Sequence, residues 1–245
     1  MVFILPVLTV AWLCASVLYS PWLVVMAAMT MSWSVHISFH EAVHRCGPGW
    51  RGVLAGIMAT PIMGLPLDGY RLHHRNHHLY NNEESDVSCT WVRDAGGVRP
   101  RNRWWYAVSW PTGLMRSMIW ARGEALAGRV EPWIHSRLRM QQALLVVVLV
   151  VLACFTWWWL ALYLMYVWLG WTFISLHNYG QHPPFPGGIV SIHLRWYNWL
   201  MHRNGLHVEH HASPQAPIAE LQVDVHAPHT CVPFFVPRLL IGRRS

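Results

Sequence analysis

The sequence predicts an all-α integral membrane protein with two transmembrane helical hairpins, about four spans, and a cytoplasmic helical cap. Its 245 residues are 54% hydrophobic and only 12% charged, whereas about 25% of the residues of an average soluble protein are charged. No Asp, Glu, Lys or Arg occurs in 1–39 or in 140–194. A membrane span needs about 20 apolar residues, so each of these stretches has room for a hairpin.

The first charge-free stretch predicts spans at about 2–19 and 22–45, with a turn at Ser20 and Pro21. It lacks the basic leader of a secretory signal and is too long for one. The second stretch predicts spans at about 141–158 and 160–180, with the turn inside the run Trp157–Trp159. We treat 1–245 as one membrane domain.

The charge distribution predicts the orientation. All 18 basic residues are arginines, and they fall in three blocks, at 45–75, 93–139 and 195–244. The positive-inside rule places such blocks on the cytoplasmic side, so we expect segments 46–140 and 183–245 there. The net charge of +7 then reflects anionic lipid rather than nucleic acid. The five cysteines form no CxxC pair, which predicts neither disulfides nor a thiolate zinc site.

Two further segments have weaker signals. The apolar stretch Gly52–Leu67 is short and contains Pro61, Gly64 and Pro66. We expect it to be re-entrant or interfacial, because a full span would place the histidines before and after it on opposite faces. The stretch Arg101–Trp110 mixes Arg with Trp, as an interfacial helix does, although an ordinary surface helix would read the same way.

The sequence contains 17 histidines, and their spacing is its most informative feature. Two lie four residues apart in HEAVH, three share a helical face in HRNHH, and HVEHH repeats that spacing. Another follows NYGQ at the end of the last span. Neutral imidazole binds Fe, Zn, Cu or Ni, and nine ligands exceed the capacity of one ion, so we predict a dinuclear site. The predicted ligands are His40, His44, His74, His77, His78, His182, His207, His210 and His211.

These motifs resemble the three histidine boxes of the membrane fatty acid desaturase and hydroxylase superfamily, in order and separation. The run NNEESDVS resembles the acidic run after the second box, and LHVEHHASPQAPIAEL resembles the third box with its trailing prolines. NYGQH resembles the Asn-x-x-x-His element of acyl-CoA desaturases and the Asn-Tyr element of alkane monooxygenases. The likeness covers about residues 36–222.

The resemblance implies two iron ions that use O2 to attack an unactivated C–H bond of a lipid-like substrate. A fatty acyl desaturase is the first expectation, and a hydroxylase, ketolase or alkane-type monooxygenase is the alternative. No haem or ferredoxin domain is visible, so we expect a separate electron donor of ferredoxin, rubredoxin or cytochrome b5 type, with its reductase.

The resemblance also implies roles around the metals. Asn178 would make a water-mediated contact to one iron. Glu41, Asp86 and Glu209 lie beside or after boxes and are candidates to orient imidazole N–H groups. His36, His73 and His177 also neighbour box residues, so one of them could replace a predicted ligand.

Two other function classes fit parts of the sequence. HEAVH also satisfies HExxH, the zinc metalloprotease helix, but a zinc protease needs only one more ligand and leaves the other two boxes without a purpose. A metal transporter or sensor would place its site near the bilayer midplane, whereas these boxes lie at span ends and in loops.

Overall fold

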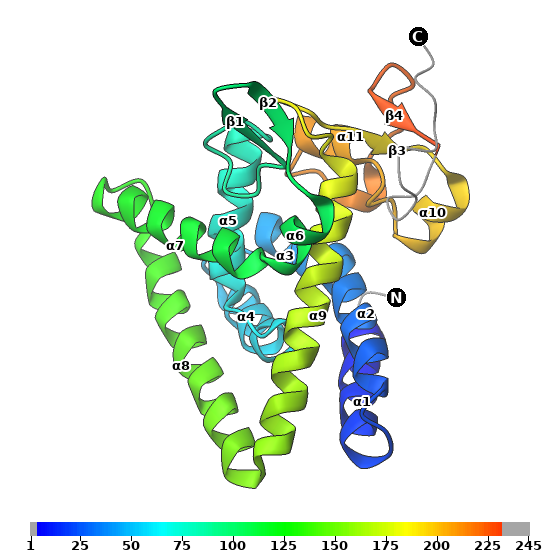
Figure 1. Cartoon of the computed structure of the whole chain (residues 1–245). Helices are drawn as coiled ribbons and strands as arrows, with labels where there is room; N and C mark the ends of the chain where they lie inside the picture. Colours follow the sequence, from blue (N-terminus) through cyan, green and yellow to red (C-terminus); the bar gives the residue numbers. More distant parts are fainter. Residues whose placement is uncertain (1–3, 232–245) are drawn as a thin grey trace.

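The computed structural model describes residues 4–231 (Figure 1). The predicted start of the first span at residue 2 and the part of the predicted cytoplasmic segment at 232–245 lie outside the described residues. Long helices form one half of the molecule. Shorter helices and two small strand pairs form a cap at one end of them, made of residues 81–131 and 182–231.

The first hairpin joins α1 (Ile4–Leu18) to a continuous helix at Leu23–Arg45. That helix comprises α2 (Leu23–Ser34), the π-helical turn η1 (Val35–Phe39) and α3 (His40–Arg45). Within 4–231, three helices are long and apolar enough to cross a membrane, and α1 is not one of them because it has only 15 residues. The predicted first span is therefore a shorter apolar helix that packs on α2.

The second hairpin is formed by α8 (Pro132–Phe155) and α9 (Trp157–Gln181), which meet at Thr156. The turn thus precedes the predicted Trp157–Trp159 run, and the Thr156 hydroxyl accepts a hydrogen bond from the backbone N–H of Trp158 (3.0 Å). Helix α8 also begins before the predicted residue 141. Arg137 and Gln141 are buried against the protein, so the helix continues through a polar segment that hydropathy excludes from a span.

Between the hairpins lie α4 (Trp50–Met63) and α5 (Leu67–Tyr80), bent by 89° relative to each other. The bend is at Gly64, whose φ of 64° favours glycine. His44 before the predicted re-entrant segment Gly52–Leu67 and His74 after it approach to 2.9 Å between their Nε2 atoms. The chain therefore enters and leaves on the same side, as predicted for a re-entrant segment, and α4 stops short of the α8–α9 turn (Figure 1).

A buried apolar core joins α2, α4, α5 and α9, with Met31, Met63, Leu67 and Tyr166 at its centre. The outer face of α8 is almost entirely exposed. In a chain with these hydrophobic helices, that face is the one suited to contact lipid.

The cap contains elements that the sequence did not predict. Strands β1 (Trp91–Asp94) and β2 (Gly97–Pro100) form an antiparallel hairpin, and β3 (Ser191–Ile192) pairs in parallel with β4 (His229–Thr230). The helices of the cap are α6 (Arg103–Val108), α7 (Trp110–Leu126), α10 (Arg195–Leu200) and α11 (His207–Ala212), with the turn η2 (Ile218–Glu220).

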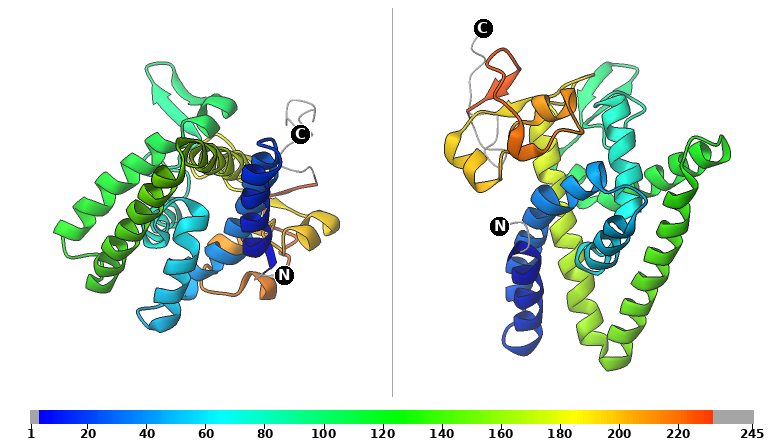
Figure 2. Two further views of the ribbon diagram at one scale, coloured as in Figure 1. Left: turned by 90° about the horizontal axis from the view of Figure 1, so that it is seen from below. Right: turned by 180° about the vertical axis from the view of Figure 1, so that it is seen from behind.

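Helix α7 extends from beside the middle of α9, where Trp110 Nε1 donates to the Trp168 carbonyl (3.2 Å), to the start of α8 (Figures 1 and 2). It carries exposed Met115, Met118 and Ile119, as an interfacial helix does. The helix predicted over Arg101–Trp110 is divided at Ser109 between α6 and α7.

Candidate metal centre

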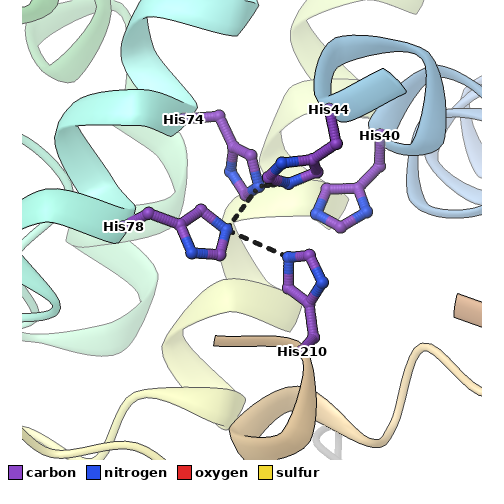
Figure 3. Close-up of side chains that lie close together, drawn as sticks. All are labelled: His40, His44, His74, His78 and His210. Atoms are coloured by element: carbon purple, nitrogen blue, oxygen red, sulfur yellow. Dashed lines mark hydrogen bonds between the residues drawn. The ribbon is translucent and has the colours of Figure 1, made fainter. Parts of the chain in front are cut away.

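The fold brings the nine predicted histidines together in two adjacent groups. In each group the candidate ligand atoms all lie within 4.8 Å of one another. Group one contains His40, His44, His74, His78 and His210 (Figure 3). Group two contains His77, His182, His207 and His211.

Helix geometry explains why two helices serve both groups. Successive side chains are rotated by about 100° around an α-helix, so His77 and His78 of α5 point in different directions. His78 joins His74 in group one, while His77 joins group two. Helix α11 does the same with His210 on one side and His207 and His211 on the other.

In group one, imidazole nitrogens converge from α3, α5 and α11 (Figure 3). The Nε2 atom of His74 lies 2.9 Å from that of His44 and 2.9 Å from that of His78. The Nε2 atom of His78 also lies 3.0 Å from that of His210. A ring nitrogen carries either one proton or one lone pair, so protons alone cannot satisfy the two contacts that His74 and His78 each make.

In group two, backbone and carboxylate partners fix the imidazole tautomers. His182 donates from Nδ1 to the carbonyl of Gly188 (3.1 Å), because a carbonyl can only accept. Its Nε2 therefore carries a lone pair, and it lies 2.7 Å from Nε2 of His207. His77 Nδ1 lies 2.8 Å from the carboxylate of Asp86, and its Nε2 is buried without a hydrogen-bond partner among the described residues.

Both groups fit a bound cation. Bonds from imidazole nitrogen to a metal are about 2.0–2.1 Å long, so nitrogens around one ion lie about 3 Å apart, as they do here. Lone pairs that converge in a buried site repel one another unless a positive charge lies between them. Five and four imidazoles without a thiolate suit a borderline transition metal.

Burial keeps the four imidazoles that follow the last span neutral, which is the form that binds metals. Outside the spans, burial lowers the pKa of His182 to about 3. Burial and then neighbouring imidazoles lower the pKa of His207, His210 and His211 well below the ordinary value. Burial would raise the pKa of Asp86, but His77 and Ser88 outweigh it and lower that pKa well below its ordinary value, so the carboxylate stays ionised.

The predicted orienting residues have different surroundings. Asp86 contacts His77, whereas Glu41 binds Arg45 (3.1 Å) and the backbone N–H of Ile218 (3.3 Å). Glu209 accepts hydrogen bonds from Ser191, His193 (3.0 Å) and the backbone N–H of Asp224 (3.0 Å), all outside the nine histidines. Asn178 donates to the hydroxyl of Tyr106 (2.7 Å).

The three alternative ligands lie outside both groups. The rings of His36 and His177 lie in contact, with centroids 4.1 Å apart and planes tilted by 33°, and His177 also contacts the Tyr197 hydroxyl at 3.2 Å. His73 Nδ1 lies 2.5 Å from the Ser117 hydroxyl.

A buried ionic network behind group one escaped the sequence analysis. Asp68 is fully buried and accepts hydrogen bonds from Arg71 (2.8 Å), Arg137 (2.7 and 3.0 Å) and Gln141 (2.7 Å). Arg71 in turn binds backbone carbonyls at the end of α3, including that of Cys46 (2.9 Å). The network therefore ties the helix of His40 and His44 to the helix of His74 and His78. The one signal in the sequence was Arg137 and Gln141 beside an apolar run.

The second missed residue is Asn82, which links two loops of group two. Its side-chain amide donates to the carbonyls of Pro183 (2.9 Å) and Gly188 (3.2 Å), and its carbonyl accepts from the backbone N–H of Thr90 (2.9 Å). Both Asn82 and the preceding Asn81 have a positive φ, which Asn tolerates better than most residues. The turn they form brings Asp86 to His77.

A cavity of about 120 Å³ adjoins both groups and lies among α5, α6, α7 and α9. His40 and His74 of group one and His77 and His207 of group two all line it. Its other walls combine apolar side chains with polar ones. The apolar residues are Leu65, Val87, Trp110, Leu114, Trp171 and Ile174, and the polar ones include Ser88, Arg101, Tyr106, Arg116 and Asn178.

Comparison with known proteins identifies the family. No curated protein sequence matches the chain. A family model described as fatty acid desaturase matches residues 3–227, which contain all nine histidines. This match covers most of the chain and agrees with the resemblance of the histidine boxes, so the chain belongs to the fatty acid desaturase family.

Proposed function

We propose that this multi-pass membrane oxidoreductase is an O2-dependent di-iron enzyme that attacks an unactivated C–H bond of a lipid-like substrate, as a fatty acyl desaturase. The observation that carries the proposal is the division of nine imidazoles into two adjacent groups beside one partly apolar cavity. Each group would hold one iron through the residues named above. Iron at these sites would supply the oxidising chemistry.

The protein's own residues have three tasks in this proposal. His182, His207, His210 and His211 stay neutral and preorganised, because burial disfavours their protonation. Asp86 and the Gly188 carbonyl hold His77 and His182 in the tautomer that directs Nε2 inward. The apolar walls of the cavity, such as Trp110 and Trp171, would exclude water and hold one carbon of an alkyl chain beside the metals.

Electrons would come from a separate ferredoxin, rubredoxin or cytochrome b5 type protein and its reductase, at the cytoplasmic face. His44 and His78 are only partly buried. Both line a second hollow, together with Arg71, Arg75 and Trp133. Reconstitution with each type of donor tests this part, with oxidised lipid per reduced carrier as the readout.

The main test is mass spectrometry of lipids from cells that express the wild type, His210→Ala or His226→Ala. His210 belongs to group one, whereas the exposed His226 belongs to neither group and serves as the matched control. We expect a product that has lost two hydrogens in the wild type and the control, and none in His210→Ala.

Metal analysis of the same proteins separates the alternatives. About two iron ions per chain support the proposal, because nine imidazoles are too many for one ion. A product that gains one oxygen instead would identify a hydroxylase, ketolase or alkane-type monooxygenase with the same site. One zinc with peptidase activity would contradict the proposal, and the outward position of Glu41 already disfavours that role.

A further inference from the structure

Two arginines line the same cavity as the box histidines. Arg101 follows β2 and is half-buried, and Arg116 belongs to α7 and lies exposed at the rim. Backbone carbonyls fix both side chains: Arg101 Nε donates to the Trp91 carbonyl (3.2 Å), and Arg116 donates to the Val87 carbonyl. Since a guanidinium has five N–H donors, each arginine keeps donors for a further partner.

Among residues 4–231, no carboxylate forms an ion pair with Arg101 or Arg116, whereas Arg71 and the buried Arg137 both bind Asp68. Asp86 is the acidic residue nearest in sequence to Val87, and its oxygens are already bound by His77, Ser88 and the backbone N–H of Asn82. Partial burial and then the charge of Arg101 lower the pKa of Arg116, and together they outweigh the nearby Asp86 carboxylate, which would raise it.

The remaining walls indicate what the anion is attached to. Leu65, Trp110, Trp171 and Ile174 present apolar surface in the same cavity. Paired guanidinium groups bind carboxylate and phosphate through charge-assisted hydrogen bonds, often with two parallel bonds. An alkyl chain with one acidic end satisfies both kinds of wall.

We propose that Arg101 and Arg116 bind the anionic end of the substrate, a carboxylate or a phosphate ester joined to an alkyl chain, in the cavity beside the two histidine groups. The inference rests on the proposed function, because it assigns the cavity to the substrate of the metal centre. It makes the substrate an acidic amphiphile rather than an uncharged hydrocarbon.

The test is equilibrium dialysis of the iron-loaded protein in detergent with radiolabelled octanoate, octyl phosphate and octanol. The three ligands share one chain and differ in charge, and the two anions distinguish a carboxylate from a phosphate ester. We expect the better anion to bind at least about tenfold more tightly than octanol, because hydrogen bonds between charged groups are about that strong. Equal binding of octanol and both anions would overturn the inference without any variant.

Variants then test whether these two arginines cause the preference for anions over octanol. Arg101→Gln and Arg116→Gln should each weaken binding of the anion by about tenfold and leave the affinity for octanol unchanged. Arg122→Gln is the matched control, because this exposed arginine lies on the same helix α7 but does not line the cavity. The inference would be contradicted if these variants lost equal affinity for the anion and for octanol. It would also be contradicted if Arg122→Gln lost as much affinity for the anion.

Iron content of the same samples keeps this inference apart from the proposed function. Protein with about two irons per chain and no preference for anions contradicts only the role of the arginines. Protein that prefers anions but holds no iron and yields no oxidised lipid contradicts only the proposed function. If a glutamine variant does not fold, Arg116→Lys replaces it; it should keep part of the preference because it keeps the charge.

Discussion

The two histidine groups are built from the same helices but are held in place differently. Group two is held residue by residue: His77 contacts Asp86, and His182 donates to the Gly188 carbonyl. In group one, Nδ1 of His40 and of His210 is buried without a hydrogen-bond partner among the described residues. The imidazoles of group one are instead positioned by their helices.

Those helices are tied together by Asp68. Arg71 joins this carboxylate to the end of α3, and Arg137 joins it to α8. Group two therefore depends on loops that deliver hydrogen-bond partners, and group one depends on a buried ion network several residues away. The comparison predicts which mutations affect which group.

The largest effect should follow from removal of a ligand. In His182→Ala, group two keeps three imidazoles, and we expect iron to fall to about one per chain with complete loss of activity. In His44→Ala, group one still has four imidazoles, so part of its iron should remain although activity is lost. Iron analysis and lipid mass spectrometry measure both. Equal iron loss in the two variants would contradict the difference between the groups.

The next largest effect should come from Asp68→Asn, which leaves Arg71 and Arg137 buried without a counter-charge. Loss of one partner of a buried ion pair costs about 3–5 kcal/mol, so thermal unfolding in detergent should occur at a markedly lower temperature. The iron that remains in the variant should be that of group two. Glu131→Gln is the control, because its pair with Arg75 is exposed and contributes at most about 1 kcal/mol. A control as destabilised as Asp68→Asn would exclude this role for the network.

Three of the four predicted spans and the clustering of the nine histidines were accessible to sequence analysis for a simple reason. Stretches without charge report the membrane directly, and imidazoles at i, i+3 and i+4 must share a helical face. The Asp68–Arg137 pair was not accessible, since its partners lie 69 residues apart and hydropathy averages over about 19 neighbouring residues. The same averaging missed the early start of α8.

Sequence adjacency was a poor guide to the carboxylates. Glu209 lies between His207 and His210, yet helix rotation of about 100° per residue turns it toward Ser191 and His193. Asp86 is several residues from its partner His77 and reaches it because Asn81 and Asn82 turn the chain back. Backbone conformation of this kind is not encoded in residue spacing.

A smaller effect is expected from Asp86→Asn, which tests the other side of the comparison. The change removes the charge that holds His77 while it preserves shape. Loss of such an orienting partner lowers metal affinity by about 10–100-fold, and we expect this for group two only. Competition with a chelator measures it. Asp94→Asn is the control, because Asp94 binds the exposed Arg99; equal weakening of both groups would refute a local role for Asp86.

The smallest effect should come from Tyr106→Phe, at the cavity wall beside group two. The Tyr106 hydroxyl donates to the Ser88 carbonyl (2.9 Å) and accepts from Asn178 (2.7 Å). Its loss should cost about 1 kcal/mol in unfolding free energy, with Tyr19→Phe, an exposed site, as the control. Iron in both groups should stay unchanged, because neither bond reaches a histidine of the two groups. Release of the iron of group two in Tyr106→Phe would contradict this expectation. It would mean that the position of Asn178, which this hydroxyl holds, affects metal binding more than Asp86 and the Gly188 carbonyl do.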